Sequence, residues 1–102
     1  MTDFYPDGKP MAERIFKNDL QEGRTVIFHK NGQLKEVQYF ERGLRNGGDT
    51  LWYETGKIEF ASWFVNGKKQ GFLQKWSPEG NLIFQAVYEQ DVPVEINGQP
   101  VK

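Results

Sequence analysis

The sequence predicts an all-β repeat protein, an antiparallel β-meander of four stacked hairpins that forms an elongated, twisted and curved sheet. Three observations predict this fold. Glycines recur with a period of 24 residues. Short runs of aromatic and β-branched residues alternate with turn residues, which is typical of short antiparallel strands. No segment has the apolar periodicity of a helix of usable length.

The repeat is defined by two columns of glycine. The first column holds Gly8, Gly32, Gly56 and Gly80, and the second holds Gly23, Gly47 and Gly71. A fixed period in this range is the signature of a repeat architecture. We therefore expect a single domain, residues 1-102, made of four 24-residue repeats at about 4-27, 28-51, 52-75 and 76-99.

The first glycine column ends a short loop in each repeat. The loops read Pro6-Asp7-Gly8, Lys30-Asn31-Gly32, Glu54-Thr55-Gly56 and Pro78-Glu79-Gly80. Proline has no N–H for a strand ladder, so we place Pro6 and Pro78 inside a three-residue loop, at the first central position of a type I turn. The glycine then takes the left-handed position that closes the loop. A β-branched residue in place of Gly56 is therefore expected to impair folding.

This loop sets the pairing of the two strands that it joins. His29 is expected opposite Gln33, Phe28 opposite Leu34 and Val26 opposite Glu36, so that even-numbered residues share one face. We expect that face to be the core, formed by Val26, Phe28, Leu34, Phe40, Trp52, Ile58, Phe60, Phe64, Phe72, Trp76, Leu82, Phe84 and Tyr88. A single sheet cannot cover itself, so either it curls around this face or a partner covers what remains.

The opposite face is half-polar and is the candidate contact surface. Tyr39 and Trp63 occupy the same repeat column there, and tyrosine and tryptophan are enriched at binding hot spots. We predict partner binding at Tyr39, Trp63, Ile27 and Val37, with Lys35 and Glu59 as a polar rim. The alternative, that these side chains are ordinary decoration of a sheet, stays open.

The second glycine column closes longer segments that link one hairpin to the next, and these look like looser turns. In the fourth repeat the glycine of this column is replaced by Glu95, and Pro93 appears nearby. We expect the array to end there, because proline protects an edge strand from further pairing. The tail from Ile96 to Lys102 is expected to add one short final strand.

No constellation of side chains points to catalysis, a cofactor or a metal. The chain has no cysteine, and it has no phosphate-binding loop, dinucleotide fingerprint or metal-ligand spacing. His29, the single histidine, lies at a strand end with no nucleophile in its column, so we read it as a solvated residue. Glu36 falls on the aromatic face, where we expect a rim position that reaches solvent. We therefore expect no enzyme.

The balance of charge restricts the classes of partner. Thirteen basic and 14 acidic residues give a formal net charge of −1. Such a chain lacks the basic face that attracts nucleic acid and the polybasic patch that attracts anionic lipid. We expect a protein partner, with a homo-oligomer left open. The N-terminus does not read as a signal peptide and no apolar run is long enough to cross a membrane, so a cytoplasmic protein is expected, with a secreted protein whose leader was removed left open.

The third repeat resembles the bacterial variant of the MORN repeat. The matching residues are Tyr53, Gly56-Lys57, Trp63 and Asn66-Gly67-Lys68-Lys69-Gln70-Gly71. The resemblance covers Phe4 to about Glu95 as four copies, with departures from the family pattern at Arg42 and Glu95. It implies stacked antiparallel hairpins. Bacterial members are often described as antitoxin or immunity components, and other MORN arrays are associated with scaffolding or phospholipid contact.

Three functions follow from the residues and the resemblance together. The leading hypothesis is a non-enzymatic protein-binding module, an antitoxin or immunity protein that neutralises a partner toxin. Repeat arrays present extended surfaces suited to such partners. The alternatives are a scaffold protein associated with membrane phospholipid, and a small-ligand or glycan-binding groove between stacked rings.

Overall fold

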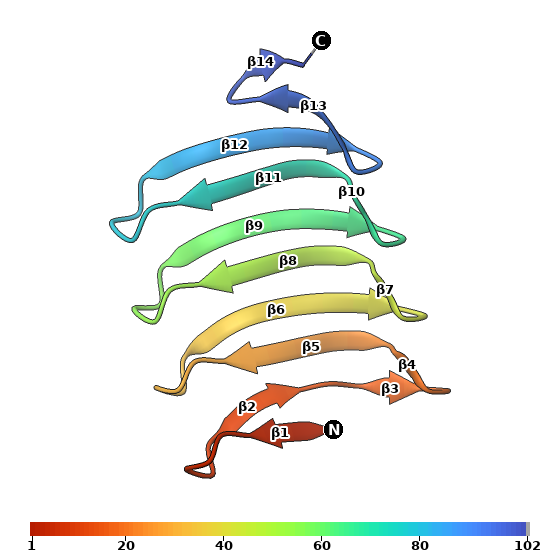
Figure 1. The fold of residues 1–102 in the computed structure, drawn as a ribbon, viewed down its shortest axis with the longest axis vertical. Helices are drawn as coiled ribbons and strands as arrows, with labels where there is room; N and C mark the ends of the chain where they lie inside the picture. Colours follow the sequence, from red (N-terminus) through yellow and green to blue (C-terminus); the bar gives the residue numbers. More distant parts are fainter. Residues whose placement is uncertain (102) are drawn as a thin grey trace.

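The computed structural model describes residues 1–101 as a meander of antiparallel strands without a helix (Figure 1). The strands are β1 (Thr2–Phe4), β2 (Pro10–Glu13), β3 (Phe16–Lys17), β4 (Leu20–Gln21), β5 (Gly23–Phe28), β6 (Leu34–Glu41), β7 (Leu44–Arg45), β8 (Gly47–Trp52), β9 (Ile58–Val65), β10 (Lys68–Lys69), β11 (Gly71–Trp76), β12 (Leu82–Glu89), β13 (Val92–Ile96) and β14 (Gln99–Pro100).

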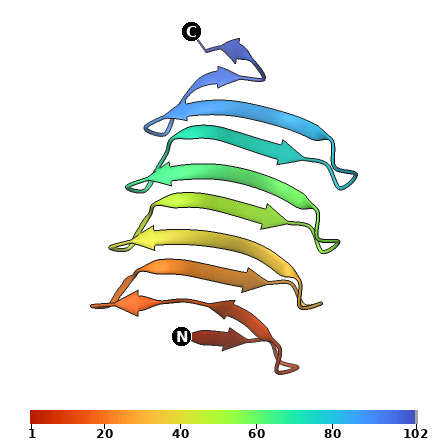
Figure 2. The ribbon, with the colours of Figure 1, turned by 180° about the vertical axis from the view of Figure 1, so that it is seen from behind.

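Strands that follow one another in the chain are neighbours in space. A 12-stranded sheet has the order β1-β2-β5-β6-β8-β9-β11-β12-β13-β14, with β7 beside β6 and β10 beside β9, while β3 and β4 form a separate pair. Figure 2 shows the same order from behind. The predicted all-β meander of consecutive hairpins is confirmed.

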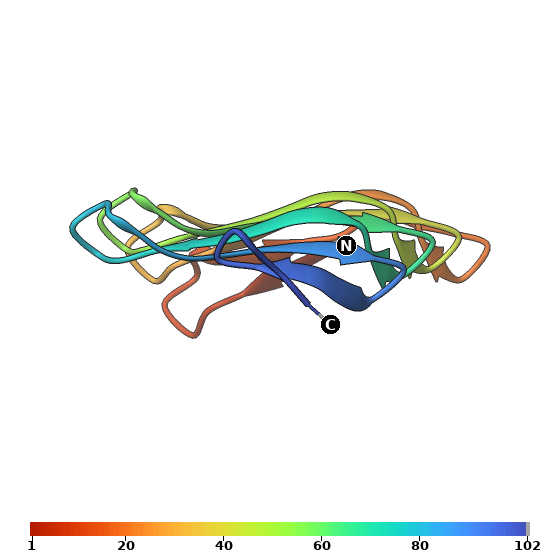
Figure 3. The ribbon, with the colours of Figure 1, turned by 90° about the horizontal axis from the view of Figure 1, so that it is seen from above.

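The sheet is one layer thick (Figure 3). Its extents are 48 × 37 × 14 Å, and its radius of gyration is 15.3 Å. A compact domain of this length has a radius of gyration of about 13 Å. The molecule is therefore elongated and thin.

The predicted aromatic core face is wrong, because no second layer lies over either face. The buried hydrophobic residues are the small or central side chains Ala12, Val26, Leu73 and Ala86. Of the rings and aliphatic side chains expected in the core, Phe72 is 59% exposed and Leu82 is 49% exposed. Burial in a single layer comes only from neighbours on adjacent strands, which cover short side chains in mid-sheet best.

The three-residue loops are confirmed. The His29 amide donates to the Gln33 carbonyl at 2.8 Å, and the Gly32 amide donates to the His29 carbonyl at 2.9 Å. The same pair of hydrogen bonds closes the loops that begin at Pro6, Glu54 and Pro78. Each loop ends in a glycine of positive φ, between 88° and 98°. Such a backbone is disfavoured for every residue that carries a Cβ.

Replacing Gly56 by valine is expected to lower the free energy of unfolding by about 1–2 kcal/mol. Gly56 has a φ of +94°, and nothing lies within 4 Å of the position that a Cβ would occupy. The expected loss therefore comes from backbone strain alone. Thermal and urea unfolding of the variant measures it, and unchanged stability would contradict the left-handed requirement.

The pairing beyond the loop differs from the prediction by one residue. Phe28 lies opposite Leu34 as expected, but Ile27 then pairs with Glu36, so Lys35 is an extra residue in a β-bulge. The predicted pair of Val26 with Glu36 is wrong, since Val26 pairs with Val37. Because side chains alternate along a strand, each bulge moves the rest of its strand to the opposite face.

The same bulge recurs in every repeat. Met11, Glu59 and Ile83 are the extra residues in β2, β9 and β12. The even-numbered rings therefore divide between two faces. Trp52 and Phe72 lie on one face, whereas Phe60 and Phe64 lie on the other.

The segments expected as looser turns are two-residue hairpin turns followed by a short return strand. Both central residues have positive φ at Asn18-Asp19, Arg42-Gly43, Asn66-Gly67 and Gln90-Asp91. This is the type I′ conformation, whose twist matches that of the flanking strands. Each turn is followed by a two-residue strand, β4, β7 or β10, or by β13 at the end of the array.

The array ends where the second glycine column is interrupted. Glu95 stands in the place of Gly23, Gly47 and Gly71, and β13 runs from Val92 to Ile96 with Val94 as an extra residue in its pairing with β12. The chain then reverses at Asn97-Gly98 and adds β14, which carries Pro100 at the sheet edge. The tail from Ile96 thus adds β14 as one short final strand, as expected. Lys102 lies outside the described residues.

Candidate protein-docking face

One face of the sheet, here called the ladder face, is covered by its own side chains. It carries the rings of Phe40, Phe64 and Tyr88, with cations between them. The Arg45 guanidinium lies 4.4 Å from the centre of the Phe64 ring and 5.9 Å from that of Phe40. The Lys69 ammonium lies 5.3 Å from the centre of the Tyr88 ring. Such cation–π contacts hold consecutive repeats together.

A buried carboxyl group lies beside this ladder. Asp49 is 5% exposed, and its Oδ2 atom accepts from Arg45 of the preceding turn. The pKa of Asp49 is raised to about 7, first by burial and then by the facing Glu36 carboxyl, while the Arg45 guanidinium opposes both effects. The Asp49 Oδ1 atom has no hydrogen-bond partner among the described residues. Because the Glu36 carboxylate can only accept, a hydrogen bond between the two acids requires a proton on one of them.

Glu36 itself lies on the ladder face, half-buried between Ile27 and Leu51. Its Oε2 atom accepts from the Gln38 side chain at 2.9 Å. The expected rim position is therefore wrong, because strands pair with Glu36 on both sides. Sequence reasoning also overlooked Asp49, because nothing near it in the chain marks it as buried.

Hydrogen bonds of one kind connect the repeats at their hairpin loops. The Tyr5 and Tyr53 hydroxyls donate to the carbonyls of Phe28 and Trp76, at 2.7 and 2.6 Å. His29 occupies the same column, and its Nε2 atom lies 2.7 Å from the Trp52 carbonyl. A carbonyl only accepts, so Nε2 carries the proton. His29 is thus a link between repeats and not a solvated strand end.

Replacing Tyr53 by phenylalanine is expected to lower the free energy of unfolding by about 1 kcal/mol, the usual value of one such hydrogen bond. The ring and its packing remain, so the change removes only the bond to the Trp76 carbonyl. Urea unfolding of this variant and of the equivalent Tyr5→Phe measures the effect. If neither variant loses stability, these bonds do not hold the repeats together.

The opposite face, here called the open face, carries most of the exposed large hydrophobic side chains. Cross-strand pairing and alternation place on it Phe4, Ile15, Leu20, Leu34, Tyr39, Leu44, Ile58, Trp63, Val65, Phe72, Leu82 and Val92. The ladder face holds Phe16 and Ile96 of this exposed set. A large exposed apolar surface on one side marks an interaction site.

A row of side chains crosses the middle of the open face from strand to strand. This central row consists of the cross-strand pairs Arg24–Tyr39, Gly48–Trp63, Phe72–Val87 and Val87–Glu95. At the joints between these hairpins, the Tyr39 and Trp63 carbonyls accept from the backbone amides of Asn46 and Gln70. Tyr39 is 43% exposed, Trp63 is 53% exposed and Phe72 is 59% exposed. The Trp63 ring lies over Gly48, where an added Cβ would be 3.5 Å from the ring.

A shallow hollow of about 430 Å³ lies beside Trp63 in this row. It is lined by Ala61, Ser62, Trp63, Gln70, Gly71, Phe72 and Gln74. Phe72 is the residue of this site that sequence reasoning missed, because the unrecognised bulges placed it on the expected core face. The hollow between two exposed rings offers a place for an apolar side chain of a partner.

The structure brings together half of the predicted contact residues. Tyr39, Val37 and Trp63 share the open face, since Val37 lies two residues from Tyr39 along β6. Ile27 lies on the ladder face, because it pairs with Glu36 and not with Val37. Lys35 and Glu59 are the extra residues of two bulges near the hairpin loops, outside the central row.

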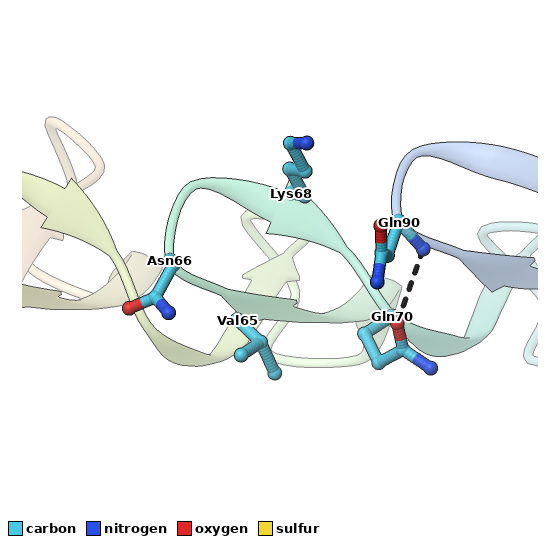
Figure 4. A pocket seen from close by; sticks show the side chains of 5 residues that line it. All are labelled: Val65, Asn66, Lys68, Gln70 and Gln90. Atoms are coloured by element: carbon cyan, nitrogen blue, oxygen red, sulfur yellow. Dashed lines mark hydrogen bonds between the residues drawn. The ribbon is translucent and has the colours of Figure 1, made fainter.

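A second hollow, of about 310 Å³, lies at the two-residue turn Asn66-Gly67 and shares Gln70 with the first (Figure 4). It is lined by Val65, Asn66, Lys68, Gln70 and Gln90. The Gln70 Oε1 atom accepts from the backbone amide of Gln90 at 3.1 Å. Glu22 and Asn46 make the same bond to the next turn of the array, so this hollow is a regular feature of the joint between repeats.

No group of three or more histidine, cysteine, aspartate or glutamate residues is placed to hold a metal ion in residues 1–101. The same residues contain no helix that could cross a membrane.

The fold and the open face define a single-layer β-hairpin repeat protein with one exposed apolar side. The family model of the MORN repeat variant matches residues 1–18 and 21–42, which supports the resemblance to the MORN-repeat family. The loops, bulges and I′ turns of the matched part recur through β12, so the structural repeat extends beyond the match. No curated protein and no solved structure gives a significant match to the chain.

Proposed function

We propose that this protein is a non-enzymatic protein-binding module of the cytoplasm that docks another protein on its open face, as the antitoxin or immunity partner of a toxin. The exposed central row, with Tyr39, Trp63 and Phe72, is the observation that carries the proposal. Exposed aromatic side chains at the centre of a surface are typical binding hot spots. The MORN-repeat match supports the broader part of this proposal, a repeat-based binding module, and does not bear on the antitoxin role.

The two faces differ in how their side chains are used. On the ladder face, Phe40 and Phe64 contact Arg45, and Asp49 is paired with the same arginine. On the open face, the Trp63 and Phe72 rings border an unfilled hollow. A partner that covers the open face gains apolar burial without breaking any of these internal contacts, since burial is favourable roughly in proportion to apolar area.

Site-specific photocross-linking tests the docking face directly. A photoreactive phenylalanine analogue at position 72 is expected to cross-link to another protein in the native host. The matched control is the same analogue at Phe16, a phenylalanine that is 46% exposed on the ladder face. Cross-links from position 72 alone support the proposal, and equal cross-linking from both positions contradicts it.

The antitoxin role requires a separate assay. The chain is expected to protect cells that express the toxin encoded beside it, and Trp63→Ala is expected to abolish protection while the variant stays folded. Protection that is unaffected by changes at Trp63 and Phe72 would contradict a neutralising role for the open face.

A further inference from the structure

The middle of the open face is uncharged over five strands. From β6 to β12 the central row holds Tyr39, Gly48, Trp63, Phe72 and Val87. The neighbouring row, nearer the hairpin loops, holds the uncharged residues Val37, Thr50, Ala61, Gln74 and Gln85. An identical surface can approach this area without repulsion between like charges, which is a condition for a contact between two copies.

The ends of the central row carry opposite charges. Arg24 begins the row on β5, Glu95 ends it on β13, and Trp63 lies in the middle on β9. A copy turned over about an axis along β9 presents this row in reverse order. Arg24 of each copy then lies opposite Glu95 of the other. A two-fold arrangement of this kind makes each contact twice.

The same reversal matches large side chains with small ones. Gly48 and Phe72 lie on the strands on either side of β9, so the Phe72 ring of one copy comes opposite Gly48 of the other. Tyr39 comes opposite Val87 in the same way. Alternation of large and small residues lets two layers interdigitate.

The face is large enough for a stable contact. Its two long dimensions are 48 and 37 Å. A specific interface buries roughly 800 Å² on each partner, which is less than such a face offers. Two sheets stacked face to face are a common β architecture, with the layers about 10 Å apart.

We propose that the open face is covered by a second copy of this chain, stacked face to face with its strand order reversed about β9. The inference rests on the proposed function, because both place a protein on the open face: the second copy covers this face in the free protein, and the toxin of the proposed function displaces it. The two thin sheets become the layers of a β-sandwich, and the exposed rings of both copies form its core.

Sedimentation equilibrium of the purified full chain tests this dimer. The wild-type protein is expected at twice its monomer mass of 11.9 kDa. Phe72→Asp places a charge at two positions of the symmetric contact and is expected to weaken dimerisation about 100-fold. Phe16→Asp, the matched change on the ladder face, is expected to leave the dimer intact. Circular dichroism checks that each variant is folded, and Phe72→Gln replaces Phe72→Asp if the latter unfolds.

A charge exchange tests the reversed order. Arg24→Glu and Glu95→Arg are each expected to weaken the dimer several-fold, and the double variant is expected to restore it. If the double variant does not restore the dimer, the reversed arrangement is wrong. A dimer that survives both Phe72→Asp and Phe72→Gln also overturns the proposal, because its contact lies elsewhere.

A wild-type chain that stays monomeric at the highest soluble concentration overturns the second copy as partner. The proposed function survives that result if the photoreactive group at position 72 still cross-links to a different protein. If position 72 cross-links to no protein, the proposed function fails as well. The two failures are therefore distinguishable.

Discussion

Asp49→Asn is expected to raise the free energy of unfolding by about 4 kcal/mol at pH 8 and to change it little at pH 4. The pKa of Asp49 is about 7 in the folded chain, against an ordinary value of 3.8. Between these two values the folded chain holds a proton that the unfolded chain has released. The wild-type protein therefore loses stability as the pH rises from about 4 through 7. Asparagine is uncharged at every pH and removes this loss.

The charged groups around Asp49 define the control. Glu36 raises its pKa and Arg45 lowers it, so Glu36→Gln is expected to reduce the pH dependence without abolishing it. Urea unfolding at several pH values measures the three proteins. If Asp49→Asn is less stable than the wild type at pH 8, then the pair of ionised Asp49 with Arg45 is net stabilising, which contradicts the raised pKa.

The sequence predicted those parts of the fold that depend on local backbone requirements. Gly32 and Gly56 sit in left-handed positions because no other residue adopts them without strain, and so the period and the three-residue loops could be predicted. Pro6 and Pro78 excluded a two-residue loop, since neither can donate to a ladder. The end of the array near Glu95 followed from the same kind of argument.

The sequence could not predict the bulges, and the assignment of faces failed for that reason. The extra residues Lys35, Glu59 and Ile83 share neither size nor charge, so no side-chain signal marks them. A bulge lengthens one strand by a residue and reverses every later side chain. Phe72, on the strand opposite a bulged one, was therefore assigned to a core that a single layer does not have.

The candidate site was predictable only in part, because its residues come from different repeats. Tyr39 and Trp63 could be aligned by the period alone, since they occupy the same column 24 residues apart. Asp49 could not be recognised, because its burial depends on Arg45 folding back over it from the short strand β7. Such burial arises from tertiary packing and leaves no local pattern in the chain.

Trp63→Ala is expected to weaken binding of the protein that covers the open face by about 2 kcal/mol or more. Trp63 is 53% exposed at the centre of the central row, so its ring contributes more to a contact than to the fold. Its loss is expected to lower the free energy of unfolding by about 1–2 kcal/mol, less than the 3–5 kcal/mol for a buried tryptophan. Sedimentation equilibrium or titration with the cross-linked partner measures binding, and urea unfolding measures stability.

The adjacent residue provides the matched control, because Phe64 points to the ladder face. Its ring contacts Arg45, so Phe64→Ala is expected to cost about 2–3 kcal/mol of stability and to leave binding nearly unchanged. Trp63→Ala should thus mainly weaken binding, whereas Phe64→Ala should mainly lower stability. A Trp63→Ala variant that loses 3–5 kcal/mol of stability would show that Trp63 is packed as a core residue. Retention of both stability and affinity would leave the central row without a role in binding.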